Sequence, residues 1–396
     1  MVLNKKQQTW LFSLITLTFW MPSYFYTPIL PAYVRYLGGS LAMVGMVSGA
    51  YGLTQALLRI PNGIWADRLG RKKPFIIAGF MAGILSNLLF MTTPAASGLF
   101  WARALAGVSA TTWVTLTLFM AEQYPPEKLT QTMGILYAVS NVGQLLASTS
   151  GGYIAQFWGW KAPFFAALLA GVLGIFFLIF VDKEAPKVTE KLTLRSSVAT
   201  GFQRWVLTAS VLGILIQYGS WVLISFTPIV ATNLGASKGE LGIVSLFIMG
   251  PTIVGSFFIG KFLKVAGQRR LLLFGFGLIA LTLILLPGVK SLHQLYFLVT
   301  FGGLGRGIIL PVLMGMCLQG ISANLKGTAM GFFQAIYAVG MFLGPAVSGV
   351  LSDFYGLTWA FILAGVLMII GGLGGWIITT VTKASLKTLN KEGVSK

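Results

Sequence analysis

Apolar runs of roughly 20 residues recur along the whole sequence, and each run is long enough to cross about 30 Å of hydrocarbon as a helix. Hydrophobic residues make up 56% of the chain and charged residues only 9%, a balance that excludes an ordinary soluble globular protein. Lipid offers no partners to free backbone N–H and C=O groups, so open strands are excluded and helices are required. The sequence therefore predicts an all-α membrane protein.

Glycine and proline turns divide this apolar sequence into twelve predicted membrane helices. We expect them at 10–36, 41–66, 74–93, 97–121, 130–155, 162–181, 206–230, 239–262, 270–288, 293–319, 327–351 and 357–381. A polar segment with charges of both signs follows the sixth helix. The sequence thus predicts an N-terminal six-helix bundle at 1–181, a cytoplasmic linker at 182–205, and a C-terminal six-helix bundle with a cytoplasmic tail at 206–396.

The formal charge of +19 invites a nucleic-acid interpretation, but the positions of the cations argue against it. Of the 28 lysines and arginines, 21 lie in tails and loops on one side of the predicted helices, 4 lie on the other side, and 3 lie inside spans. This asymmetry follows the positive-inside rule. We therefore expect a multi-pass protein of the cytoplasmic membrane with both termini in the cytoplasm, basic loops that contact anionic lipid headgroups, and no nucleic-acid partner.

The two halves of the sequence are related by a fixed offset of 197 residues. This offset aligns Gly45 with Gly242 and Gly152 with Gly349. A Thr-Pro-Ile triplet at 27–29 also recurs at 227–229, after a shift of three residues. Most matches are turn or packing glycines in gap-free stretches, so the agreement indicates a duplicated six-helix unit.

A charged loop after the second apolar span reads Gly63-Ile-Trp-Ala-Asp67-Arg68-Leu-Gly70-Arg71-Lys72-Lys73. This pattern resembles the signature loop of the major facilitator superfamily, and the duplication extends the resemblance over nearly the whole chain. The resemblance implies two six-helix bundles related by a pseudo-twofold axis along the membrane normal. It also implies secondary transport by alternating access, with a small-molecule substrate bound between the bundles near the membrane midplane.

The same resemblance implies that the loop is a conformational latch. In the family, the carboxylate at Asp67 faces the positive N-terminal end of the eleventh helix, here near 327–331, where the helix dipole favours it. Arg71 would meet an acid at the inner end of the fourth helix, and Glu122 lies there. The expected latch comprises Gly63, Asp67, Arg68, Gly70, Arg71, Lys72 and Glu122. In the second half Lys264 stands where Asp67 stands, so no matching latch is expected.

Small residues at intervals of three or four recur on the fifth helix and on its repeat partner, the eleventh. They are Gly143, Gly151 and Gly152 on the fifth, and Gly340, Gly344 and Pro345 on the eleventh. Such spacing lets another helix pack closely, and a proline can bend its helix. The fifth helix resembles a motif of proton-driven drug exporters, although Ala147-Ser148 stands where that motif has Gly-Pro. A general packing motif is the alternative.

Three arginines fall inside predicted spans, where a charge costs at least about 2.5–3.5 kcal/mol on insertion scales and needs a polar destination. We expect Arg103 and Arg306 to face one central cavity, because their helices occupy corresponding places in the two halves. Arg59 is expected to line the cavity, to snorkel, or to pair with Glu122. None of the nine acidic residues falls mid-span, which favours anionic or neutral polar cargo over lone cations. Proton coupling then has only two candidate carriers: Glu122 or the cargo itself.

Polar and aromatic side chains within the spans complete the expected substrate cavity. They are Tyr24, Tyr26, Arg103, Trp113, Asn141, Gln144, Gln217, Tyr218, Arg306, Gln334 and Tyr337. We find no phosphate-binding loop, metal-ligand cluster or nucleophile constellation, so an enzyme, a cofactor and a bound metal are not expected.

The sequence therefore favours a monomeric secondary transporter, with export of an organic or amphipathic compound and protons as a candidate coupling partner. Uptake of an organic anion or sugar is the alternative within that class. A receptor that reuses the fold is a more distant one, because no sizeable soluble domain is present in the sequence.

Overall fold

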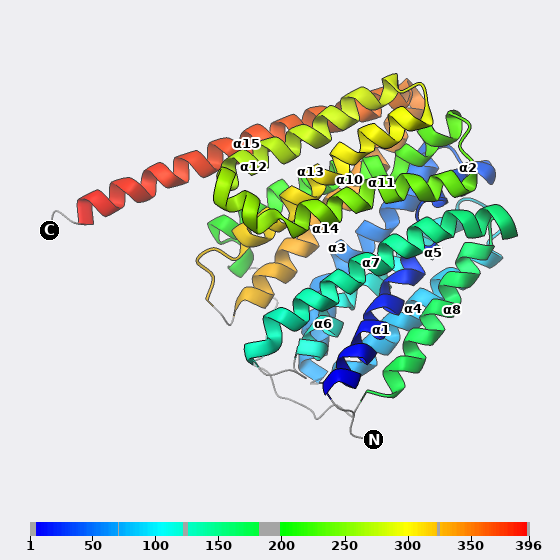
Figure 1. Cartoon of the computed structure of the whole chain (residues 1–396), viewed down its shortest axis with the longest axis horizontal. Coiled ribbons are helices and arrows are strands. Elements are labelled where there is room, and N and C mark those ends of the chain that lie inside the picture. Colours follow the sequence, from blue (N-terminus) through cyan, green and yellow to red (C-terminus); the bar gives the residue numbers. More distant parts are fainter. Residues whose placement is uncertain (1–4, 70, 122–125, 182–198, 323–324, 394–396) are drawn as a thin grey trace.

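The computed structural model describes residues 5–69, 71–121, 126–181, 199–322 and 325–393, and all its regular elements within these ranges are helices (Figure 1). Several parts of the expected latch fall outside this description. Gly70 and Glu122 lie in the gaps, and the side chains of Asp67 and Arg68 are likewise not described. Most of the expected linker, 182–198, also lies outside the described residues.

The described residues of the N-terminal half form eight helices. They are α1 (Lys5–Tyr24), α2 (Leu30–Tyr36), α3 (Leu41–Leu69), α4 (Lys73–Thr92), α5 (Gly98–Thr111), α6 (Trp113–Ala121), α7 (Pro126–Trp158) and α8 (Ala162–Ile179). The first predicted helix is thus interrupted at 25–29, where Pro28 supplies no N–H for a helical hydrogen bond. The fourth is interrupted at Thr112, whose N–H and Oγ1 both donate to the Ser109 carbonyl, at 3.1 and 2.8 Å.

The C-terminal half, within the described ranges, forms six helices and one short 3₁₀ turn. They are α10 (Arg204–Asn233), α11 (Lys238–Phe257), α12 (Ile259–Leu285), η1 (Leu286–Gly288), α13 (Leu292–Cys317), α14 (Lys326–Tyr355) and α15 (Leu357–Gly393). The predicted eighth helix, 239–262, is wrong at its end, because α11 stops at Phe257. The chain turns instead within α12 at Gly267, whose φ of 74° lies in the left-handed region that glycine adopts without strain.

Nine helices in the described ranges are long and apolar enough to cross a membrane. The pairs α1–α2 and α5–α6, together with α7, supply the other crossings of the predicted twelve. The connections at 37–40, 93–97, 159–161, 234–237, 289–291 and 356 lie on one face, which we call the distal face. The connecting residues 71–72, 258–267 and 318–322 lie on the other, the proximal face.

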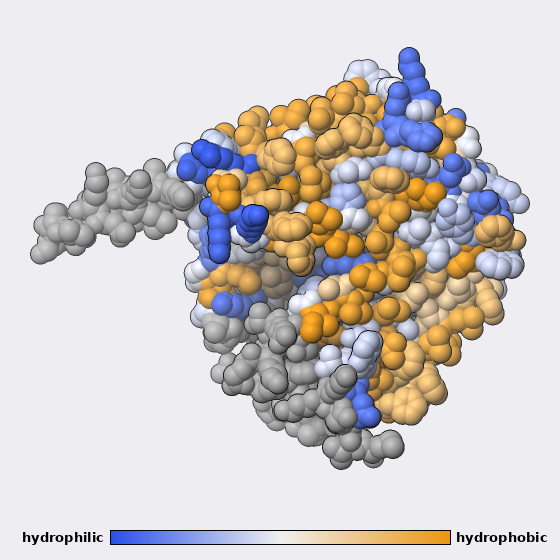
Figure 2. Space-filling view, viewed as in Figure 1, coloured by the Kyte–Doolittle hydropathy of each residue, from blue (hydrophilic) through white to orange (hydrophobic). Residues whose placement is uncertain are grey.

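The outer surface of the bundle is strongly apolar. Figure 2 shows a broad hydrophobic surface over the flanks of the helices, with hydrophilic residues gathered toward the ends. Leu85, Phe176, Phe274 and Phe297 are among the large apolar side chains that stay exposed. A patch this extensive requires a lipid environment.

The two halves meet along two helix crossings that the 197-residue offset relates to each other, α3 with α14 and α11 with α7 (Figure 1). Glycines let the backbones touch at both. A Cβ added at Gly45 would lie 2.1 Å from the Pro345 carbonyl oxygen, and one at Gly349 would lie 2.5 Å from the Leu41 carbonyl oxygen. At the second crossing, a Cβ at Gly242 would lie 2.5 Å from the carbonyl oxygen of Thr149.

The glycines singled out in the sequence lie at close helix contacts in the same way. A Cβ added at Gly151 would lie 1.7 Å from the carbonyl oxygen of Phe25, and one added at Gly152 would lie 2.6 Å from the carbonyl oxygen of Lys238. Gly340 and Gly344 contact the backbone of α10 at Ile214 and Tyr218, whereas Gly143 is looser, at 3.3 Å from the Leu17 side chain. None of these residues except Gly143 tolerates a side chain without a backbone shift.

Toward the proximal face the same helices separate. Cβ atoms added at Gly63 on α3, and at Gly327 and Gly331 on α14, would meet no described atom within 4 Å. Within the described ranges Gly63 therefore has no close helix contact, and the halves touch at the distal face and diverge toward the proximal one.

Replacing Gly45 by alanine tests the distal crossing. Its Cβ would overlap the backbone of α14, and such overpacking costs about 1–3 kcal/mol. We expect a lower melting temperature of the purified protein in detergent. Gly250→Ala on α11 is the control, because its Cβ would meet nothing within 4 Å and the change restricts only the unfolded chain. Equal melting temperatures for the two variants would contradict the close crossing.

Candidate functional site

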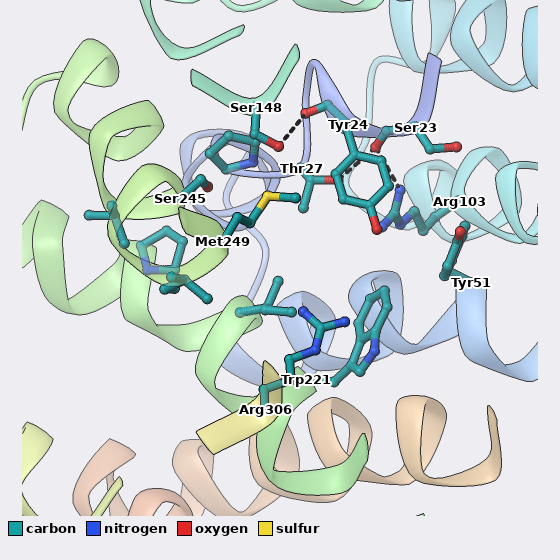
Figure 3. Close-up of a pocket in the computed structure, with 15 residues that line it drawn as sticks. Ser23, Tyr24, Thr27, Tyr51, Arg103, Ser148, Trp221, Ser245, Met249 and Arg306 are labelled. Carbon is teal, nitrogen blue, oxygen red and sulfur yellow. Dashed lines mark hydrogen bonds between the residues drawn. The ribbon is translucent and has the colours of Figure 1, made fainter. Parts of the chain in front are cut away.

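A cavity lies between the two halves, with an empty volume of about 600 Å³ that includes space open to solvent. Both halves line it (Figure 3). Its walls are Ser23, Tyr24, Thr27, Pro28, Tyr51, Arg103 and Ser148 from the N-terminal half, and Trp221, Ile224, Pro228, Val244, Ser245, Ile248, Met249 and Arg306 from the C-terminal half.

Arg103 enters the cavity from α5 and is firmly held. Its side chain is 3% exposed. Nη1 donates to the Tyr26 hydroxyl at 2.8 Å and, at 3.5 Å, to the carbonyl oxygen of Ser23. The guanidinium also lies over the ring of Tyr51, 4.5 Å from its centroid, a cation–π contact that disperses part of the charge.

Arg306 enters from α13 on the opposite side and has no such support. No hydrogen bond or ion pair to its guanidinium occurs within the described ranges. The Nε atoms of both arginines are buried without a partner, so the difference lies in the Nη1 hydrogen bonds and the aromatic contact of Arg103. Figure 3 shows the guanidinium directed into the space between Trp221 and Met249. The two arginines therefore face one cavity, one immobilised and one free.

No carboxylate is found among the described residues of the cavity walls. The two acidic residues whose side chains are described, Glu240 and Asp353, both lie at the distal face, Glu240 in the first turn of α11 and Asp353 near the end of α14. The described walls thus carry only positive charge, set among aromatic and aliphatic groups.

An aromatic pair joins the two halves at the cavity. The rings of Tyr51 on α3 and Trp221 on α10 are stacked, with centroids 5.4 Å apart and an interplanar angle of 26°. Tyr24 adds a third aromatic side chain, and Val244, Ile248 and Met249 form an aliphatic wall on α11. The site therefore offers a flat aromatic surface and an apolar surface beside two cations.

Several residues expected in the cavity lie elsewhere. Trp113 packs against Phe19 and Trp20 in the core of the N-terminal half, with the Trp20 ring centroid 5.1 Å away. Tyr26 lies behind Arg103 as its acceptor. The remaining ones are also absent from the walls: Asn141, Gln144, Gln217, Tyr218, Gln334 and Tyr337. Some of these side chains form hydrogen bonds inside the bundle instead. The hydroxyls of Tyr218 and Ser348, for example, lie 3.4 Å apart.

Arg59 neither lines the cavity nor snorkels. It is 6% exposed and donates Nη1 to Oε1 of Gln334 on α14 and Nη2 to Oε1 of Gln55 on its own helix. A buried guanidinium needs acceptors, and two amide oxygens supply them here. This bond joins the halves just before α3 and α14 separate.

The sequence did not indicate most of the small and apolar residues that line the cavity. Ser23, Thr27 and Ser245 were not singled out, nor were Tyr51, Trp221 and the aliphatic wall. One signal was available: the repeated Thr-Pro-Ile triplets mark the paired prolines Pro28 and Pro228, and both prolines line the cavity.

Polar caps close both crossings at the distal face. The Asp353 carboxylate on α14 accepts hydrogen bonds from the backbone N–H groups of Leu41 and Ala42, at 2.8 and 3.0 Å. The Gln156 amide oxygen on α7 accepts one from the N–H of Gly239, at 2.9 Å. The 197-residue offset aligns Gln156 with Asp353 and Ala42 with Gly239, so the two contacts occupy equivalent positions in the repeats. We call these two contacts the distal clasps.

A duplicated helical bundle with a cavity lined by both halves, whose helices touch at the distal face and separate toward the proximal face, is the architecture of a membrane carrier of small molecules. The sequence matches the profile of the Major Facilitator Superfamily over residues 12–212 and 209–395. The chain belongs to this superfamily and is a secondary transporter of the cell membrane.

Relatives and solved structures agree with that assignment. The chain is 24% identical over 379 residues to Multidrug resistance protein 2 of Bacillus subtilis, covering 92% of each chain. It is 25% identical to the quinolone resistance protein NorA of Staphylococcus aureus, covering 92% of this chain and 94% of that one. The fold is similar to that of the nucleoside transporter NupG, with a TM-score of 0.78, 12% identity and coverage of 95% and 99%. An inward-facing bacterial homologue of the lysosomal transporter Spinster gives a TM-score of 0.78 at 16% identity, with coverage of 94% and 96%.

Asp353→Ala tests the distal clasps. Loss of a cap on a helix N-terminus costs about 1 kcal/mol, so we expect roughly a fivefold rise in the population with separated distal ends. Spin labels at Trp101→Cys and Phe297→Cys, both exposed on α5 and α13, report the distance between halves in a Cys317→Ala background. Glu240→Ala is the control, because Glu240 caps only its own helix through Ser237. Identical distance distributions for Asp353→Ala and the parent would rule out a gating role.

Proposed function

We propose that this transporter exports a small organic or amphipathic compound from the cytoplasm, using the cavity between Arg103 and Arg306 as its substrate site. The observation that carries the proposal is that residues from both halves line the same cavity. Movement of one half against the other therefore changes access to this cavity. The printed names of two relatives, a multidrug resistance protein and a quinolone resistance protein, support export over uptake.

The orientation of the carrier follows from its cations. Arg71, Lys261, Lys264 and Arg270 lie at the proximal face, and basic loops stay in the cytoplasm. We therefore take the proximal face as cytoplasmic, with both termini on that side. The conformation described here is then the one that loads cargo from the cytoplasm.

Alternating access then requires the two ends of the α3–α14 crossing to exchange roles. The distal clasps open, and the proximal part of α3 moves toward the start of α14. The free space at Gly63, Gly327 and Gly331 accommodates that approach. In the closed proximal state Asp67, with Arg71 and Glu122, forms the latch inferred from the signature loop. The bond between Arg59 and Gln334 lies between the two ends and is suited to act as the pivot.

Protons are the proposed coupling ion, with Glu122 or an ionisable cargo as the carrier. The described residues of the cavity walls include no carboxylate, which favours a proton carrier outside the substrate site. Uptake of an organic anion or sugar is the second candidate, and the positive walls are what favour it.

Transport in inverted membrane vesicles tests the direction. We expect vesicles that contain the protein to accumulate at least one compound from a panel of aromatic carboxylates, sugars and cationic dyes. We expect accumulation to increase when the lumen is acidified. Uptake confined to right-side-out vesicles would show an importer, and accumulation indifferent to the gradient would eliminate proton antiport.

Asp67→Asn tests the latch. The neutral amide loses the charge–dipole interaction at the start of α14, so the proximal-closed state is destabilised. We expect at least about a tenfold slower transport rate with normal membrane insertion, which fluorescence of a fused reporter checks. Lys264→Asn, at the repeat-related position, is the control and should transport at the parental rate. Parental transport by Asp67→Asn would remove the latch from the mechanism.

A further inference from the structure

We infer that the cavity selects organic anions with an aromatic body, and that Arg306 holds the anionic group with Arg103 as a second cation. This inference rests on the proposed function, because it takes the cavity as the transport site. It specifies the charge, shape and contact points of the cargo.

The charge of the cargo follows from what the walls lack. Two guanidinium groups face the cavity, and no described carboxylate lies on its walls to neutralise either. An unpaired charge at membrane depth is expensive and is retained where it serves a pathway. An anion between the arginines removes that cost, because hydrogen bonds between guanidinium and carboxylate are among the strongest in proteins.

The two arginines are not equivalent. Arg103 already donates to Tyr26 and to the Ser23 carbonyl and lies over an aromatic ring. Arg306 makes no hydrogen bond within the described part of the chain, and its planar group is directed into the cavity (Figure 3). Arg306 is therefore the primary contact, and Arg103 contributes mainly its positive potential.

The body of the cargo follows from the remaining walls. The stacked pair of Tyr51 and Trp221 offers an aromatic face, on which a planar ring gains stacking energy beyond its buried area. Val244, Ile248 and Met249 on the opposite side receive an apolar substituent. An amphipathic anion that carries both an aromatic ring and an apolar substituent fits these walls.

A sugar fits less well. Its hydroxyls need acceptors, and carboxylates or free amides are missing from the described walls. Two wall hydroxyls already donate to backbone carbonyls: Thr27 to Ser23 at 2.6 Å and Ser148 to Tyr24 at 3.3 Å. A lone cation is repelled by both arginines.

A charge series on one scaffold tests the inference directly. Naphthylacetate, naphthylacetamide and naphthylethylammonium have similar size and differ in charge. Binding to the purified wild-type protein is measured by quenching of tryptophan fluorescence, since Trp221 lines the site, and by ligand-induced thermal stabilisation. We expect the carboxylate to bind at least about tenfold more tightly than the amide or the ammonium ion. Equal or tighter binding of the ammonium ion would overturn the inference, whatever the variants do.

Variants then locate the contact. Arg306→Gln should weaken carboxylate binding by about tenfold or more and leave amide binding within about twofold, whereas Arg306→Lys should recover part of the loss. Arg103→Gln should weaken it less. Arg270→Gln, at an exposed arginine on the proximal face, is the matched control and should bind as the wild type. Wild-type affinity of Arg306→Gln for the carboxylate would overturn the assignment.

The outcome separates this inference from the proposed function. Tight carboxylate binding without accumulation in vesicles would refute transport and leave the anion site standing. Accumulation of the ammonium ion by a protein that does not bind the carboxylate would keep the transporter and refute the anion site.

Discussion

Backbone contact between the halves at the distal face is the constraint on which the remaining structure depends. Lipid tails are as apolar as leucine, so hydrophobicity does not drive these helices together, and close packing at small residues must do so. Gly45 and Gly349 bring α3 against α14, and Gly242 and Gly152 bring α11 against α7. Because contact is tight at one end and lost at Gly63 and Gly331 toward the other, the helices diverge and leave the cavity beside the crossing.

Three intramembrane arginines show how the surroundings decide the role of a buried charge. Arg59 donates through both Nη atoms to neutral amide oxygens, one from each half, and so joins the halves. Arg103 is held by a phenol, a carbonyl and an aromatic face. Arg306 has none of these within the described ranges. The three guanidinium groups thus differ in the partners that surround them, and the shared residue type does not reveal this difference in the sequence.

The sequence predicts the architecture well because its strongest signals are periodic. The 197-residue offset anticipates which crossings are equivalent, and it extends to the distal clasps at Gln156 and Asp353. The cavity positions of Arg103 and Arg306 follow from the cost of charge in lipid. Trp113 and Gln217 could not be placed in the same way, because lipid-facing and interior faces of a membrane helix are both apolar and hydropathy does not distinguish them. The break before Pro28 was hidden by the apolar residues on either side of it.

The two crossings differ in charge although the duplication makes them equivalent in shape. A carboxylate caps α3 through Asp353, whereas the corresponding cap on α11 is the neutral Gln156. At the proximal ends the difference recurs, since α3 carries Asp67 where the second half carries Lys264. A carboxylate at a helix N-terminus is stabilised by the helix dipole by about 0.3–1 kcal/mol at an exposed site. In the proposed cycle each state thus has one carboxylate on the N-terminus of the partner helix: Asp353 on α3 when the distal face is closed, and Asp67 on α14 when the proximal face is closed. Exchange of one such contact for a similar one keeps the two states close in free energy, which a carrier needs if the cargo is to decide between them.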